Sequence, residues 1–92
     1  MQDSKNIMGF SCGNSHTVAV DSEGSVYTMG LNSQGQLGLF GERFAKNFKK
    51  MNSNMIGNIQ KVFAIADCTF FVNEDLEVFF CGKYSHRSNQ FI

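Results

Sequence analysis

Two cysteine–histidine pairs are the residues of this sequence whose types and spacing could do chemistry. His16 follows Cys12 by four positions, and His86 follows Cys81 by five. Thiolates and imidazoles in groups of four bind structural zinc, but these spacings are not those of a zinc knuckle. Cys12 and Cys81 are also expected on strands of different structural units. We therefore expect no metal and interpret His16 as a structural residue, hydrogen-bonded to neighbouring backbone.

Cys68 and His16 form a candidate pair of another kind, for nucleophilic catalysis. A catalytic thiol needs an adjacent imidazole and a third group that orients the imidazole. These two residues would have to meet across two structural units and find that third group there. We expect no catalytic residue and no enzymatic activity.

The glycine-rich segment over residues 30–38 is a candidate phosphate-binding loop by composition. It lacks the Lys-Ser/Thr pair of such a loop, and no helical pattern opens directly after it. Its glycines are instead expected to permit a tight chain path between a third strand and an outer strand. The sequence therefore predicts no nucleotide site and no other cofactor.

Composition excludes several further classes of function. The 92 residues carry 8 basic and 8 acidic side chains, so no bulk charge draws the chain to nucleic acid or an anionic membrane. The apolar content of 42% is too high for disorder. No apolar run reaches the roughly 18 residues of a membrane span. Three cysteines and no export signal favour a cytoplasmic or nuclear location with free thiols.

An internal repeat organises the chain. Gly30 falls on Gly82 at an offset of 52 residues, and the same offset aligns three more identical pairs: Thr17 with Thr69, Val20 with Val72, and Val26 with Val78. The chain holds about 1.8 such units, and repeats of this length are typical of solenoids, propellers and arrays. We divide it into residues 1–55, the first repeat with its linker, and residues 56–92, a degenerate and truncated second repeat.

Each unit is predicted to be β. The first has strands over residues 7–12, 16–20 and 25–29. A turn at residues 21–24 joins the last two of them; Asp21 opens a type I turn there and Gly24 takes the left-handed position. In the second, strands over 62–66, 69–72 and 77–81 surround the turn at 73–76. Leu76 stands there in place of glycine, which costs about 1 kcal/mol if the left-handed conformation is kept.

Residues 40–58 admit two interpretations. Phe40, Phe44, Phe48, Met51 and Met55 recur at spacings of 4, 4, 3 and 4, which is helical periodicity and would place an amphipathic helix on a partner or membrane surface. The alternative is an outer strand over residues 43–49 followed by a surface loop. The tail over residues 85–92 is predicted to begin a further outer strand.

The segment from Cys12 to Gly38 resembles one full repeat of the regulator of chromosome condensation family. It keeps a Cys-Gly-x-x-His-Thr start and a Gly-x-Asn-x-x-Gly-Gln-Leu-Gly finish over 27 consecutive positions. Met29 replaces the usual Trp, and the second unit departs from the motif at both ends. The residues assigned to the structural repeat motif are Cys12, Gly13, His16, Thr17, Gly24, Gly30, Asn32, Gly35, Gln36, Leu37, Gly38 and Gly82.

The resemblance implies an all-β fold: about two four-stranded antiparallel blades of a β-propeller, usually of seven blades, which fewer blades cannot close. It implies a non-enzymatic protein-binding scaffold module. One alternative is part of a guanine-nucleotide exchange factor for a Ran-like small GTPase, and another is a nonfunctional truncated product. The expected partners are another protein, for which a small GTPase is a candidate, and further blades from a longer chain or other copies.

Overall fold

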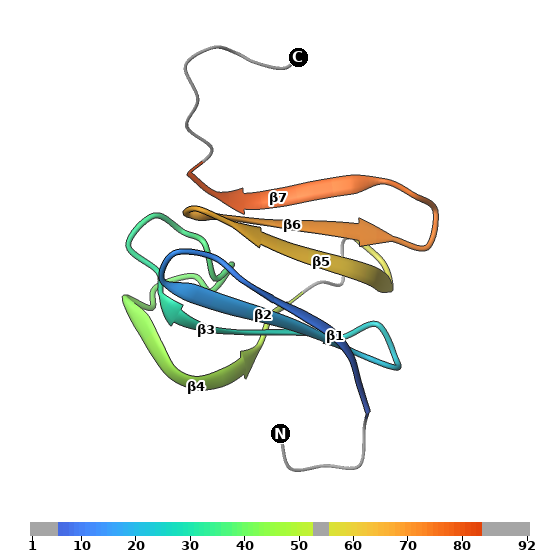
Figure 1. Cartoon of the computed structure of the whole chain (residues 1–92), viewed down its shortest axis with the longest axis horizontal. Helices are drawn as coiled ribbons and strands as arrows, with labels where there is room; N and C mark the ends of the chain where they lie inside the picture. Colours follow the sequence, from blue (N-terminus) through green and yellow to red (C-terminus); the bar gives the residue numbers. More distant parts are fainter. Residues whose placement is uncertain (1–5, 53–55, 84–92) are drawn as a thin grey trace.

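The computed structural model describes residues 6–52 and 56–83, and within them the chain forms two antiparallel sheets (Figure 1). The first sheet has the order β1-β2-β3-β4 and the second the order β5-β6-β7. The strands of the first sheet are β1 (Ile7–Cys12), β2 (His16–Asp21), β3 (Val26–Leu31) and β4 (Phe44–Lys50). Those of the second are β5 (Ile59–Ile65), β6 (Cys68–Asn73) and β7 (Val78–Gly82). The all-β prediction is confirmed.

The turns of the two sheets show that the repeat is structural. In the first, the backbone N–H of Gly24 donates to the carbonyl of Asp21 at 3.1 Å, and Gly24 has φ of 83°. In the second, Leu76 N–H donates to the Asn73 carbonyl at 3.0 Å, and Leu76 has φ of 65°. Leu76 therefore holds the left-handed conformation that its position in the repeat predicts, at a cost of about 1 kcal/mol.

The same 52-residue offset relates features outside the turns. A β-bulge lies at Ile7/Gly9 in one sheet and at Ile59/Lys61 in the other. Gly30 and Gly82 both have positive φ, 115° and 102°. The second sheet is thus a copy of the first over three strands. A fourth strand of the second sheet, predicted to begin in residues 85–92, lies outside the described residues, and the division between residues 55 and 56 stays a prediction because residues 53–55 lie outside them too.

The prediction of a helix over residues 40–58 is wrong for the central part of that segment. Phe44–Lys50 forms β4, which pairs antiparallel with β3, as the outer-strand interpretation predicted. The phenylalanine stripe is not a buried face, because Phe40 and Phe44 are exposed and Phe48 is only half-buried. Backbone pairing with the neighbouring strand outweighs the helical spacing. Met55 lies outside the described residues.

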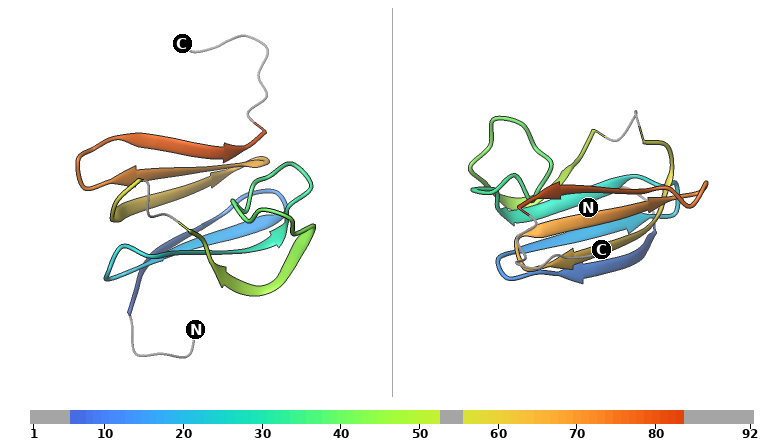
Figure 2. Two further views of the ribbon diagram at one scale, coloured as in Figure 1. Left: turned by 180° about the vertical axis from the view of Figure 1, so that it is seen from behind. Right: turned by 90° about the horizontal axis from the view of Figure 1, so that it is seen from above.

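The core lies between the two sheets, where β1 and β2 contact β5 (Figure 2). Inward-facing residues of both sheets and one residue after β4 build it: Val18, Val20, Val26, Met51, Ile59, Val62, Ala64 and Phe71. The alternation of strand residues means that each sheet also has an outer face. The described part of the chain contains no helix able to cross a membrane.

Candidate functional site

A buried hydrogen-bonded group joins the two sheets at one end of the strands. The Nε2 of His16, in β2, lies 2.7 Å from the hydroxyl oxygen of Thr69, in β6. The same hydroxyl donates to the backbone carbonyl of Gln36 at 2.5 Å. All three residues are at least nine-tenths buried. We call this group, His16, Thr69 and Gln36, the seam.

The seam fixes the tautomer of His16. The Thr69 hydroxyl has one proton, which goes to the Gln36 carbonyl, so His16 Nε2 must donate to the hydroxyl oxygen. Nδ1 then carries no proton and has no hydrogen-bond partner among the described residues. Burial lowers the pKa of His16, while its contact with the Cys68 backbone and the charge of Asp67 act in the opposite direction. The ring is therefore neutral near pH 7.

The main chain of Gly13 covers the ring of His16. A Cβ at Gly13 would lie 2.9 Å from His16 Nδ1 and 2.7 Å from the carbonyl oxygen of Ala66. Only glycine leaves space for the ring at this position. The hydrogen bond of His16 goes to a hydroxyl of the other sheet, whereas we expected it to go to neighbouring backbone.

The candidate ligands of a zinc site are not brought together in the described structure. Cys12 is exposed on the outer face of the first sheet, where its Sγ lies 3.5 Å from the Thr17 hydroxyl. His86 lies outside the described residues. Residues 6–52 and 56–83 contain no group of three His, Cys, Asp or Glu side chains that could hold a metal ion.

The two thiols near the seam are held in their protonated form. Burial raises the pKa of Cys68, and burial with the nearby Cys68 raises the pKa of Cys81 to about 12. Because the thiolate is the nucleophile, a raised pKa makes a thiol unreactive. The arrangement of Cys68 and His16 thus offers no activated thiol.

The segment between β3 and β4 forms a loop held by buried amide side chains. The Nδ2 of Asn32 donates to the carbonyls of Leu39 at 2.7 Å and Glu42 at 2.8 Å. Its Oδ1 accepts from the backbone N–H of Leu37 at 2.9 Å. One residue thus fixes both ends of the loop, and Gln36 attaches the loop to the second sheet through Thr69. These bonds explain the Asn of the motif in physical terms. The bond of Gln36 to Thr69 uses the backbone carbonyl, whereas the Gln36 side-chain Oε1 accepts from the backbone N–H of Gln34 at 2.8 Å within the loop.

The tip of the same loop is apolar and open to solvent. Phe40 is fully exposed, and Leu31 and Phe44 at the two ends of the loop are also exposed. In the right-hand view of Figure 2 the segment between β3 and β4 projects beyond the strands, although Gln36 and Leu37 within it are buried. A shallow cleft of about 470 Å³ lies at its base between Leu31 and Phe44, beside the charged side chains of Glu42 and Arg43. We call residues 31–44 the presenting loop.

The motif residues predicted from the sequence fall in four places. Gly13, His16, Gly30, Gln36 and Gly82 lie at or beside the seam. Asn32, Gly35, Leu37 and Gly38 belong to the presenting loop, Gly24 lies at the far end of the sheets, and Cys12 and Thr17 line the outer face of the first sheet. Thr69 was missed, although its identity with Thr17 in the repeat was a usable signal.

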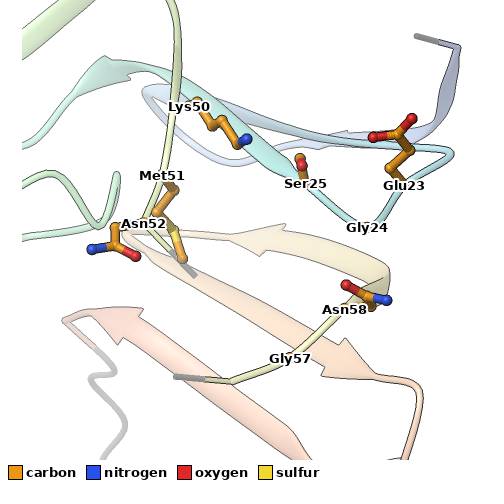
Figure 3. A pocket seen from close by; sticks show the side chains of 8 residues that line it. All are labelled: Glu23, Gly24, Ser25, Lys50, Met51, Asn52, Gly57 and Asn58. Atoms are coloured by element: carbon orange, nitrogen blue, oxygen red, sulfur yellow. The ribbon is translucent and has the colours of Figure 1, made fainter. Parts of the chain in front are cut away.

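A second cleft, of about 440 Å³, lies at the far end of the sheets (Figure 3). Glu23, Gly24 and Ser25 of the β2–β3 turn form one side, and Lys50, Met51, Asn52, Gly57 and Asn58 form the other. One of its lining residues, Asn52, is the last described residue before the gap at residues 53–55. No chemistry is assigned to it.

Comparison with known proteins identifies the repeats. Two family models described as the regulator of chromosome condensation (RCC1) repeat match the chain, one over residues 9–36 and the other over residues 23–72. No curated protein matches the sequence significantly.

Solved structures of propeller proteins are similar to this chain. Human WBSCR16 is 27% identical with a TM-score of 0.80, over 89% of this chain and 21% of that one. Yeast RCC1 (Prp20), bound to Kap60, is 16% identical with a TM-score of 0.81, over 89% of this chain and 21% of that one. A structure of Prp20p from Saccharomyces cerevisiae, described with its binding to Gsp1p and histones, is 16% identical with a TM-score of 0.81, over 89% of this chain and 22% of that one. The chain thus spans about a fifth of the length of these proteins, and the likenesses at 16% show the fold alone.

Proposed function

Because this chain belongs to the regulator of chromosome condensation (RCC1) repeat family, we propose that it is a non-enzymatic protein-binding scaffold module, part of an RCC1-like β-propeller. The structure of the presenting loop is the main support for this proposal. Its conformation is fixed by Asn32 and Gln36, and its tip displays Phe40 to solvent. An aromatic side chain on a rigid loop loses little entropy when a partner buries it, which suits a binding hot spot.

The relatives support protein partners. Prp20 has been solved bound to Kap60, and Prp20p has been characterised for its binding to Gsp1p and histones. This chain has about a fifth of the length of those proteins, so their partners are candidates for it and no more. A small GTPase is the second candidate partner, and the reported binding of Prp20p to Gsp1p favours it. With such a partner, the chain would be part of an exchange factor.

The compartment we propose is the cytoplasm or nucleus. The three cysteines are free, and two of them have thiols whose pKa burial raises. Such thiols suit a reducing compartment, in which they pack as small hydrophobic groups.

A photocrosslinking experiment tests the proposal. A photoreactive amino acid replaces Phe40 in one variant and Gln60, an exposed position in β5, in a control variant. Illumination in host cells is expected to give a discrete protein adduct from position 40 and none from position 60. The further change Asn32→Ala, which releases the loop, should abolish the adduct. Absence of an adduct at position 40, or the same adducts from both positions, would favour the nonfunctional truncated product.

Purified components test the exchange-factor alternative separately. The chain is titrated against a Ran-class GTPase loaded with fluorescent GDP, and both binding and GDP release are followed. Faster release, lost in the Phe40→Ala variant, would support exchange activity. Binding without faster release would leave the scaffold role alone.

A further inference from the structure

Basic side chains gather at one edge of the first sheet. Half of the chain's eight basic residues lie within residues 43–50, a stretch that contains no acidic residue: Arg43, Lys46, Lys49 and Lys50. All four are exposed. They lie in or directly before β4, the last strand of the first sheet in the order β1-β2-β3-β4. A chain without net charge therefore carries a local positive surface, which we call the basic edge.

A bulge in β4 turns part of the basic edge outward. The register with β3 shifts, so that residues 46–48 of β4 lie opposite Met29 alone. Figure 1 shows β4 curving away along its length, and Lys46 and Asn47 in the bulge are exposed. A bulge and lysines at a sheet edge both hinder the addition of another strand. A partner at this edge is therefore expected to contact side chains, and the β4 of a second copy would be repelled by like charge.

The basic edge begins at the cleft at the base of the presenting loop. This cleft of about 470 Å³ is lined by the apolar side chains of Leu31 and Phe44 and by Arg43 of the basic edge. Leu31 is 46% exposed and Phe44 is 56% exposed, so both have apolar surface that a ligand can remove from water. The volume is in the range of small-ligand sites. An apolar cleft and a guanidinium group thus meet in one place.

The spacing of the cations matches an extended peptide. A strand advances about 3.3 Å per residue, so Lys46 lies at most about 10 Å along the backbone from Arg43. An extended peptide advances by the same amount, so carboxylates within three positions of an apolar residue in the cleft reach both cations. Lys49 pairs with Glu42 at 3.3 Å. The charge offered to a ligand therefore comes mainly from Arg43, Lys46 and Lys50.

We propose that the cleft and the basic edge together bind an acidic peptide segment of a partner protein. One large apolar residue of the segment enters the cleft, and acidic residues beside it lie along Arg43 and Lys46, because complementary charge selects the partner. A nucleic acid fits less well, since its regularly spaced phosphates would meet the carboxylate of Glu42 next to the cleft. This inference rests on the scaffold function proposed above and adds the chemistry of the partner.

Selection from a peptide library tests the proposal without a known partner. Random short peptides displayed on phage are selected on the immobilised 92-residue chain and, in parallel, on its Arg43→Glu/Lys46→Glu variant. Peptides selected on the parent chain are expected to share a large apolar residue beside several acidic ones, and the variant should not enrich them. Both substituted residues are exposed, so circular dichroism should report an unchanged fold for the variant.

Fluorescence anisotropy with one selected, labelled peptide measures each contribution. Arg43→Glu/Lys46→Glu should weaken binding about tenfold or more, because it turns two attractions into repulsions. Phe44→Ala should weaken binding by removing one wall of the cleft. Lys61→Glu/Lys83→Glu is the matched control, since it changes the net charge equally at exposed positions in and beyond the second sheet; it should bind like the parent chain. Added salt should weaken binding to the parent chain.

Several results would overturn the proposal. Enrichment of peptides without acidic residues, or of no peptide at all, would contradict an acidic segment as the ligand. An equal loss of binding in the Lys61→Glu/Lys83→Glu control, or tighter binding of a single-stranded DNA oligonucleotide than of the selected peptide, would contradict it as well. The crosslink from position 40 in cells is a separate measurement. An adduct there that persists in the Arg43→Glu/Lys46→Glu variant would leave the scaffold function standing while this inference fails.

Discussion

Replacing Thr69 by valine removes the hydroxyl at the centre of the seam while keeping the shape of the side chain. His16 Nε2 then loses its acceptor, and the Gln36 carbonyl keeps only the long contact from Cys81 Sγ at 3.5 Å, both in a fully buried place. Each lost hydrogen bond that leaves a buried partner unsatisfied costs about 1–3 kcal/mol. The second sheet relaxes in part, so we expect a loss of about 2–4 kcal/mol in the free energy of unfolding.

Thr17→Val is the matched control, because Thr17 is the equivalent residue of the first repeat. Thr17 is half-buried, and its hydroxyl has a long contact of 3.5 Å with the Cys12 sulfur. A weak contact at a partly exposed site contributes little, so we expect a loss below about 0.5 kcal/mol. The same chemical change at two equivalent positions thus isolates the contribution of the seam.

Urea unfolding followed by circular dichroism measures both changes. Repeating the measurement at several chain concentrations shows whether self-association contributes to the apparent stability. In a domain of this size each 1 kcal/mol shifts the melting temperature by roughly 4–8 °C, so Thr69→Val should lower it by about 10 °C or more. Equal losses for Thr69→Val and Thr17→Val would refute the assignment of the seam as the joint between the sheets.

Three further predictions concern the turns, pH and metal. Leu76→Gly should raise the free energy of unfolding by about 1 kcal/mol, whereas Gly24→Leu should lower it by more, because Gly24 also abuts Asn58; equal effects in thermal melts would argue against a shared turn. The pKa of His16 is lowered in the folded chain, so the unfolded chain binds more protons below about pH 6.5 and stability should fall there as pH falls. Urea midpoints at pH 7.5 and 5.5 measure this loss, which should shrink in His16→Ala. Neither EDTA nor zinc should change the melting curve. Unfolding of the chain by the chelator would instead support a bound metal ion.

Short-range features could be predicted from the sequence because few residues determine them. The Asp21 and Gly24 turn needs one carboxylate and one left-handed residue, and both the first turn and its copy at Leu76 formed as expected. The 52-residue offset needed only the comparison of the chain with itself. The strand character of β2 and β3 followed from their β-branched residues.

Features that depend on packing between the sheets could not be predicted. The partner of His16 is Thr69, 53 residues away, and only the face-to-face packing of the sheets brings them together. The helical spacing over residues 40–58 misled because pairing with β3 decides the structure of β4.

Nuclear magnetic resonance of the His16 side chain tests the packing of the two repeats most directly. At pH 7, a long-range proton–nitrogen spectrum of the chain is expected to show the neutral ring with its proton on Nε2. Nuclear Overhauser contacts should join that ring to the methyl group of Thr69 in the other repeat. A ring protonated on Nδ1, a charged ring, or the absence of contacts with Thr69 would contradict the seam and the pairing of sheets built on it.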